Sequence, residues 1–593
     1  MDSSLFIESN KSEKRIILTK FLKYNYKNKY LDINYIQNIF NIYNLNKKIK
    51  NINLLEQIFV HTSYCYNNEL IEIENDTLDL NKIESDLKSK KLVELKLPNQ
   101  SNEKLDWLGD SLIGYLISIY LINRFTDSNE GFLSKLRTSL IKSKTLAKIV
   151  RKLELDKYLI ISNHMESLSN RNNDNILQII FKSLISYIDI EYDIYDRNIF
   201  LFCILESLIN FSELIITDIN FKDILIRYYH YNKLDNPKFE IAQIDGLSNN
   251  RIFTTNIYNS ENNIIGEGTG KSKKESEQNA AKDCLEKIQI LDNNILCWCP
   301  IIHKISSNKT IKNINIYYYK YNYNNKYIYL NNINNILKKY CSKTTNNIHY
   351  YQKALIHKSY IKENISKNEY QFAEKIKINK KKIEQDLTNN KLVELKTKSY
   401  ERLEWFGDSV LKYFITKYLL KRFSDKEFEF LTEIRSKLTN SYTLSNLGKH
   451  LNLHHYMIIS LYEENINSRN NPTYIEDIME AFIGAITLDL GEECAYEFVI
   501  NLYESHINFS EKIHSEKNYK HILQKLYQTK KWNYPIYHEI SIENVEVNDT
   551  YSYNLYTIGV YDINKKTIGI GKGKSKKIAE QNASKDALTY LQN

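Results

Sequence analysis

Apolar side chains recur every three or four residues through two long stretches of the chain. The spacing is shown by Leu112, Tyr115, Leu116 and Ile119 in the first stretch and by Leu411, Phe414, Ile415, Tyr418 and Leu419 in the second. A period near 3.6 places such residues on one face of a helix. The pattern therefore predicts two domains built mainly of α-helices.

The pattern changes after each helical stretch. In the second copy, an amphipathic segment at 519–528 precedes runs in which apolar and polar residues alternate, such as YSYNLYTIGVYD at 551–562. Alternation with period two is typical of strands. A last helix follows Ser575, a favourable N-cap residue. The predicted order is a helix, three strands and a helix.

The two halves of the chain are copies of one another. KYNYKNKY at 23–30 recurs as KYNYNNKY at 320–327. Further pairs follow in the same order: KLVELK at 91–96 and 391–396, EKLDWLGDS at 103–111 and ERLEWFGDS at 401–409, and GKSKKESEQNAAKD at 270–283 and GKSKKIAEQNASKD at 573–586. A unit of about 300 residues has been duplicated.

These patterns predict a multidomain protein of α and α+β class. Two all-α domains, called here the first and second helical domains, alternate with two α-β-β-β-α domains, called the first and second mixed domains. The predicted boundaries are 18–215 (first helical domain), 216–292 (first mixed domain), 293–314 (linker), 315–513 (second helical domain) and 514–593 (second mixed domain).

Carboxylates cluster on two predicted helices of the second copy. Glu401, Glu404 and Asp408 lie at i, i+3 and i+7, so they share one helix face. Asp477 and Glu480 lie at i, i+3 of another helix, beside small residues that let a backbone approach. Either cluster alone would be an ordinary solvated face. Buried together, they would require a hard divalent cation.

The motifs around these carboxylates resemble those of the ribonuclease III family. ERLEWFGDSVL at 401–411 follows the family signature, and ALIHKSY at 354–360, LTEIRSKL at 431–438 and the DxxEA pattern at 477–481 keep the family's order. The resemblance covers nearly the whole chain in both copies. It implies a metal-dependent endonuclease that cleaves double-stranded RNA and leaves 5′-phosphate and 3′-hydroxyl ends.

The resemblance also implies roles for the five carboxylates. Glu404, Asp477 and Glu480 would ligate Mg²⁺, for which Mn²⁺ could substitute. Asp408, together with Glu480, would organise the attacking water or a second metal ion, and Glu401 would be auxiliary.

The first copy departs from this pattern. It keeps three carboxylates, Glu103, Asp106 and Asp110, but half of the site is replaced. Alignment at an offset of 299 places Gln178 opposite Asp477, Phe181 opposite Glu480, Lys182 opposite Ala481 and Ile185 opposite Gly484. Phenylalanine cannot ligate a metal ion, and a lysine would compete with one. We therefore expect the first helical domain to be a degenerate, structural partner of the second.

The ends of both copies resemble double-stranded RNA-binding domains. The signature GKGKSKKIAEQNASKDAL at 571–588 brings lysines to a helix N-terminus, where they can meet phosphates, although lysine runs are usually only solvated faces. Both copies lack the family's Gly-Pro-x-His loop. The predicted RNA-binding residues are Lys520, Gln524, Gln528, Lys574, Lys576 and Lys577 in the second copy and the weaker set Lys271, Lys273 and Lys274 in the first.

Composition sets the remaining limits. The 593 residues carry 81 Lys and Arg against 72 Asp and Glu, a net charge of +9, which permits a polyanionic partner. The seven cysteines form no paired framework, and the start of the chain does not look like a signal peptide, so we expect a reducing, cytoplasmic location, with the nucleus also open. Cys297, Cys299 and His303 lack a fourth zinc ligand. The apolar stretch 111–123 is too short to cross a membrane.

Two alternatives remain open. The protein could be a non-catalytic binder of double-stranded RNA, although the intact carboxylates of the second copy argue against this. The nuclease domains of this family pair, so the two helical domains could pair within one chain, or two second helical domains could form a homodimer. Two domains in one chain have a high effective concentration for each other, which favours the intramolecular pair.

Overall fold

The fold is described from a computed structural model of the chain. The residues described are 15–18, 24–65, 70–73, 80–94, 100–211, 214, 221–232, 234–245, 251–288, 316–362, 366–376, 378–514, 519–530, 532–548, 551–562 and 566–592. The whole predicted linker at 293–314, with Cys297, Cys299 and His303, therefore lies outside the described residues.

The first helical domain consists mainly of helices. They are α1 (Ile33–Ile42), α2 (Ile52–Gln57), α3 (Leu80–Lys88), α4 (Glu103–Arg124), α5 (Glu130–Ile141), α6 (Ser143–Lys152), α7 (Asn163–Ser167), α8 (Asp174–Glu191) and α9 (Ile194–Leu208). A short antiparallel pair of strands, β1 (Arg15–Leu18) and β2 (Leu70–Ile73), accompanies them. The helical pattern did not indicate this small sheet.

The second helical domain repeats this arrangement. Its helices are α14 (Leu330–Cys341), α15 (His349–Lys353), α16 (Lys367–Lys375), α17 (Lys380–Thr388), α18 (Glu401–Arg422), α19 (Phe428–Leu438), α20 (Ser441–His450), α21 (Leu461–Asn465) and α22 (Pro472–His506). The long α22 is interrupted at Gly491, whose φ of 87° favours glycine. The break corresponds to the junction between α8 and α9 in the first copy.

The mixed domains each contain a three-stranded antiparallel sheet with two helices, which confirms the predicted fold class. The first is formed by α11 (Phe221–Tyr231), β3 (Lys238–Asp245), β4 (Ile252–Tyr258), β5 (Ile264–Gly270) and α12 (Lys273–Lys287). The second is formed by α24 (Tyr519–Thr529), β6 (Ile536–Asn548), β7 (Tyr551–Tyr561), β8 (Thr567–Gly573) and α25 (Lys576–Gln592), after a short helix α23 (Phe509–His514).

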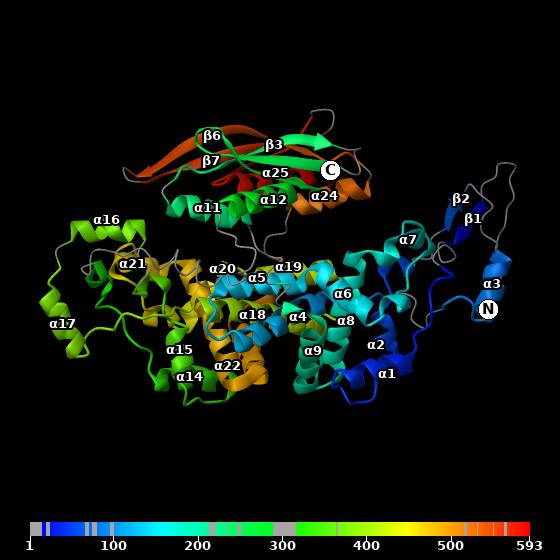
Figure 1. Cartoon of the computed structure of the whole chain (residues 1–593), viewed down its shortest axis with the longest axis horizontal. Helices are drawn as coiled ribbons and strands as arrows, with labels where there is room; N and C mark the ends of the chain where they lie inside the picture. Colours follow the sequence, from blue (N-terminus) through cyan, green and yellow to red (C-terminus); the bar gives the residue numbers. More distant parts are fainter. Residues whose placement is uncertain are drawn as a thin grey trace. The chain divides into compact units, whose positions relative to one another are not determined.

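The chain divides into two compact units, Met1–Tyr503 and Glu504–Asn593. In the first unit the two helical domains pack against each other, and Figure 1 shows α4 and α18 side by side where they meet. The rings of Tyr115 and Tyr413 stack with centroids 5.2 Å apart, and Trp107 Nε1 donates a hydrogen bond to Thr432 Oγ1 at 2.8 Å. The helical domains thus pair within the chain.

One described helix, α4, is long and apolar enough to cross a membrane by length and composition. Most of this stretch, 78%, is buried inside the protein, and Leu112 and Leu116 are fully buried. A buried core helix passes the same test, so α4 is weak evidence for a membrane span.

Candidate active site

Two helices of the second helical domain cross with their backbones in contact. A Cβ atom on Gly407 of α18 would overlap the carbonyl oxygen of Glu480 in α22, and one on Gly484 would lie 2.6 Å from the carbonyl oxygen of Leu403. Glycine is the residue that allows this approach. The crossing brings the carboxylates of α18 to the side of α22 that carries Glu480.

Four of the five predicted carboxylates line one cavity. Its volume is about 380 Å³ and its lining comprises Glu401, Glu404, Trp405, Asp408 and Glu480 of the second helical domain with Glu130, Gly131 and Ser134 of α5 in the first. The contribution of α5 was not predicted from the sequence, since no spacing rule relates residues of different domains. The cavity therefore needs both helical domains.

Asp477 is not part of this lining but lies next to it. The hydroxyl of Tyr400 donates a hydrogen bond of 2.8 Å to Asp477 Oδ2. Burial raises the pKa of Asp477, and the Tyr400 hydrogen bond opposes that rise. In the first copy Asn102 replaces Tyr400 and Ile179 replaces Asp477, so both partners of this bond are lost together.

The carboxylates of the cavity are held in an unfavourable environment. Burial, with the nearby charges of Asp477 and Glu401, raises the pKa of Glu404 to about 8. Glu480 is only 9% exposed, and burial followed by the charge of Asp408 raises its pKa well above the ordinary value. Neither carboxylate has a hydrogen bond or ion pair to another described side chain.

The chemistry of these donors suits a hard cation such as Mg²⁺, which prefers carboxylate oxygens and would relieve the repulsion. In their present positions, no three histidine, cysteine, aspartate or glutamate side chains among the described residues form a ready metal site. Asp408 instead pairs with Lys412, Nζ to Oδ2 at 2.8 Å.

The corresponding place in the first helical domain is chemically different. Lys182 pairs with Asp110, Nζ to Oδ1 at 2.7 Å, so the lysine predicted to compete with a cation holds one of the remaining carboxylates. Lys182, and not Phe181, stands where Glu480 stands in the second copy, because Gly109 faces the carbonyl oxygen of Lys182 as Gly407 faces that of Glu480. The copies therefore align here at an offset of 298, so the predicted offset of 299 is wrong by one residue, and Ile179 stands opposite Asp477. Phe181 is fully buried. Burial raises the pKa of Asp106 to about 6. The glycine crossing persists, because a Cβ atom on Gly109 would overlap the backbone of Lys182.

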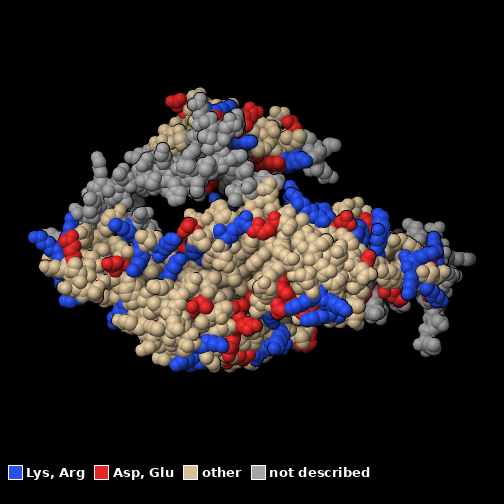
Figure 2. All heavy atoms as spheres, turned by 60° about the horizontal axis from the view of Figure 1, so that its bottom comes forward, with Lys and Arg blue, Asp and Glu red and all other residues tan. Residues whose placement is uncertain are grey.

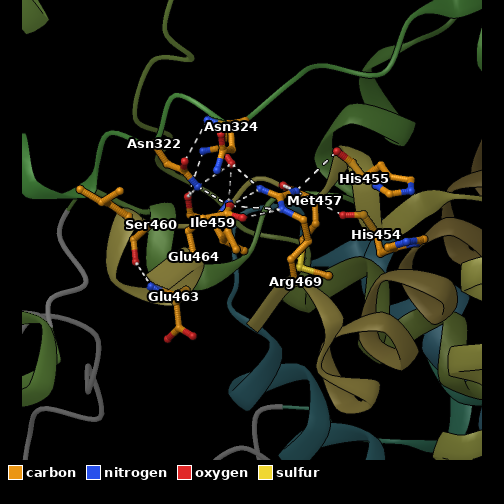
Figure 3. A network of polar contacts seen from close by, with 12 residues as sticks. Asn322, Asn324, His454, His455, Met457, Ile459, Ser460, Glu463, Glu464 and Arg469 are labelled. Carbon is orange, nitrogen blue, oxygen red and sulfur yellow. Dashed lines mark hydrogen bonds and ion pairs between the residues drawn. The ribbon is translucent and has the colours of Figure 1, made fainter. Parts of the chain in front are cut away.

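A polar network anchors the segment that leads into α22. Arg469 donates hydrogen bonds to Glu464 and to the carbonyl oxygen of Met457, both at 2.6 Å, and Asn322 donates to Glu464 (Figure 3). The KYNYNNKY motif thus ties the start of the domain to this segment. The first copy repeats the network, with Arg171 and Asn25 both bonded to Glu166. It therefore belongs to the framework and not to the intact site alone.

Two arginines reach across the pair of helical domains. The guanidinium of Arg137 lies 4.6 Å from the ring centroid of Trp405, and that of Arg435 lies 4.7 Å from that of Trp107. Burial lowers the pKa of Arg137, and the charge of Asp408 opposes the shift. Arg137 of the first copy is thus the arginine near the intact site.

The predicted RNA-binding residues of the second mixed domain lie at its surface. Gln524, Gln528, Lys574 and Lys577 are exposed. Lys520 pairs with Glu580 at 2.7 Å and Lys576 with Glu539 at 2.8 Å, contacts that the sequence pattern did not indicate. Lys576 is 64% exposed, so its ion pair is readily exchanged for a phosphate.

In the first mixed domain, Lys271, Lys273 and Lys274 are also exposed, and the backbone N–H of Lys271 donates to Glu275. Acidic and basic side chains are interspersed over the face drawn in Figure 2, without a continuous basic surface there. On that face the basic residues form only local groups.

Comparisons with known proteins agree with this architecture. The family model for the ribonuclease III domain matches residues 103–193, the ribonuclease-III-like model matches 380–506, and the double-stranded RNA binding motif matches 221–288 and 519–591. "Probable ribonuclease 3" of Acanthamoeba polyphaga mimivirus is 31% identical over 84% of this chain and 89% of its own length. The chain belongs to the ribonuclease III family.

Other members of the ribonuclease III family match one copy. "Ribonuclease 3" of Borreliella burgdorferi is 35% identical over 33% of this chain and 78% of its own length. A solved nuclease domain of ribonuclease III from Campylobacter jejuni is 25% identical and covers 29% of this chain and 96% of its own, with a TM-score of 0.22. The solved structure of Dicer from Giardia intestinalis is 15% identical and covers 69% of this chain and 55% of its own, with a TM-score of 0.31.

Family membership confirms several predictions. The chain is a hydrolase of the endoribonuclease class, and its partner is double-stranded RNA. The ribonuclease III family is generally dependent on divalent metal ions. The individual site residues stay predictions.

Proposed function

We propose that the second helical domain carries the competent cleavage site and that the first is its structural partner. The observation that carries this proposal is the contrast at one position of the crossing helices. Glu480 is a buried carboxylate with no described polar side-chain partner, whereas its counterpart Lys182 is a cation that pairs with Asp110 and offers no ligand to a metal ion. A buried, uncompensated carboxylate is costly and is retained where a cation binds.

Glu404, Asp408, Asp477 and Glu480 would hold Mg²⁺ or Mn²⁺, with Glu401 at the edge of the cavity. When bound, the ion lowers the pKa of a coordinated water and neutralises charge on the reacting phosphate. Tyr400 fixes the orientation of Asp477, while Gly407 and Gly484 keep the two helices close. Water attacks phosphorus and the 3′ oxygen leaves as a hydroxyl, so the products carry 5′-phosphate and 3′-hydroxyl ends.

The rest of the chain would hold the duplex. Lys574, Lys576 and Lys577, with Lys520, Gln524 and Gln528, would contact phosphates and sugars without reading sequence. The weaker set Lys271, Lys273 and Lys274 would add affinity. The five described cysteines form no disulfide bond with one another, which supports a reducing, cytoplasmic location.

The test is incubation of the full chain with a duplex RNA labelled at one 5′ end, with Mg²⁺, with Mn²⁺ and with a chelator. We expect cleavage with either ion and none with the chelator, and fragments that a 5′-phosphate-dependent exonuclease degrades. Tight duplex binding without cleavage under every condition would instead establish the non-catalytic binder.

A further inference from the structure

A buried ionic network lies where the two helical domains meet. Arg197 of α9 is fully buried and forms ion pairs with Asp189 of its own domain and with Glu492 of the second helical domain, the latter at 2.6 Å. Despite burial, its ion-pair and hydrogen-bond partners raise the pKa of Arg197, so it stays charged. One cation is therefore shared between carboxylates of the two domains.

Hydroxyl groups complete the network from both sides. Tyr413 of α18 donates 2.8 Å to Asp189 Oδ1, and Tyr115 of α4 donates 2.9 Å to Glu492 Oε2. Lys417 of the second helical domain pairs with Asp189 at 3.0 Å. Each carboxylate is thus contacted by the domain to which it does not belong.

The network is not symmetric, although the domains are copies. The tyrosines correspond, since Tyr115 and Tyr413 occupy equivalent positions of the repeated helix. The charges do not correspond, because the offset of 298 places Ala495 opposite Arg197 and Thr487 opposite Asp189. The position equivalent to Glu492 is the uncharged Ile194, and its neighbour Asp193 pairs with Lys47 at the surface at 2.7 Å.

The asymmetry matters for the choice of partner. Two second helical domains would bring two Glu492 carboxylates to the interface without any arginine, leaving Lys417, whose side chain is 38% exposed, as the remaining cation of the network. A buried carboxylate that loses its cation is strongly destabilising. Only the unlike pair supplies every group of the network with its partner.

We infer that the Arg197 network selects the first helical domain as the partner of the second and disfavours pairing between two second helical domains. The inference concerns association alone. It does not rest on the proposed cleavage, because the network shares no residue with the lining of the carboxylate cavity and needs neither metal ion nor RNA.

A charge exchange between two full chains tests this. One chain carries Arg197→Glu and the other carries Glu492→Arg, so neither can form the network within itself. Mixed together, the first helical domain of each chain meets a complementary second helical domain of the other. We expect light scattering to show single chains of 70.4 kDa for each variant alone and roughly twice that mass for the mixture. A chain with both substitutions should be a single chain again.

The control exchanges an ion pair that lies within one domain. Chains with Lys47→Asp and Asp193→Lys should stay separate when mixed, because that pair does not join the domains. The inference is overturned if the Arg197 and Glu492 variants stay separate, or if either variant alone runs as a dimer. Should a variant be insoluble alone, co-expression decides: a soluble two-chain complex supports the inference, and continued insolubility contradicts it.

Discussion

The two helical domains share a framework and differ in chemistry. Both keep the glycine crossing, at Gly109 and Gly407, and both keep the anchoring arginine, Arg171 and Arg469. The second retains a buried glutamate, Glu480, at the crossing where the first has Lys182, which pairs with Asp110. Packing has therefore been preserved after duplication while the cation-binding groups were lost from one copy. The first helical domain still contributes residues of α5 to the lining of the intact cavity.

The largest expected effect concerns the carboxylates. Glu480→Gln keeps the shape of the side chain but removes its charge, so cleavage should fall more than about 100-fold, beyond what loss of an outer-shell partner costs. Binding of the duplex should be unchanged. The matched variant Asp110→Asn, in the degenerate copy, should cleave within a few-fold of the wild type in single-turnover assays. Near-normal cleavage by Glu480→Gln would show that Glu480 is not a metal ligand of the cleavage site.

The next effect concerns the crossing of α18 and α22. Gly407→Ala inserts a methyl group against the Glu480 backbone, so the helices must separate, and we expect a stability loss of about 1–3 kcal/mol with loss of cleavage. Gly114→Ala, where an added Cβ meets nothing within 4 Å, is the control. Urea unfolding and single-turnover cleavage measure both. Equal behaviour of the two variants would mean that the crossing is not tight.

Lysine loops should give a smaller effect. Changing Lys576 and Lys577 to Ala should lower the slope of log affinity against log salt by about one to two, equally for all duplex sequences. The same change at Lys273 and Lys274 should reduce the slope less. Fluorescence anisotropy titrations at several salt concentrations compare them. An unchanged slope in the first variant would show that Lys576 and Lys577 lie on a solvent-exposed helix face without contacting phosphates.

The smallest effect is on stability without metal. The pKa of Glu404 is raised from 4.5 to about 8, so the contribution of this group to stability is fully present below pH 4.5 and is lost as the pH rises from there to about 8. Metal-free protein should therefore unfold at a lower temperature at pH 9 than at pH 6. Addition of Mg²⁺ at pH 9 should raise the unfolding temperature again. Glu404→Gln should flatten the difference. A thermal profile identical in wild type and variant would contradict this.

The domain order could be predicted from the sequence because the spacing of apolar residues, the repeated segments and the order of the motifs can be read directly along the chain. The face shared by Glu401, Glu404 and Asp408 follows from helix geometry, and all three line the cavity. Tyr400 could not be found this way, since a tyrosine among 47 carries no signal of its own. The Arg137 stacking and the Arg197 network join residues of different copies, and only the paired fold brings them together.

The central claim is that one competent site per pair of helical domains acts on each bound duplex. The most direct measurement is single-turnover cleavage of a perfect duplex labelled on both strands, by protein whose mass has been checked by light scattering. A single chain should nick one strand per encounter, with the second cut appearing only after rebinding. Coincident cuts in both strands by a single chain would show that the first helical domain cleaves as well.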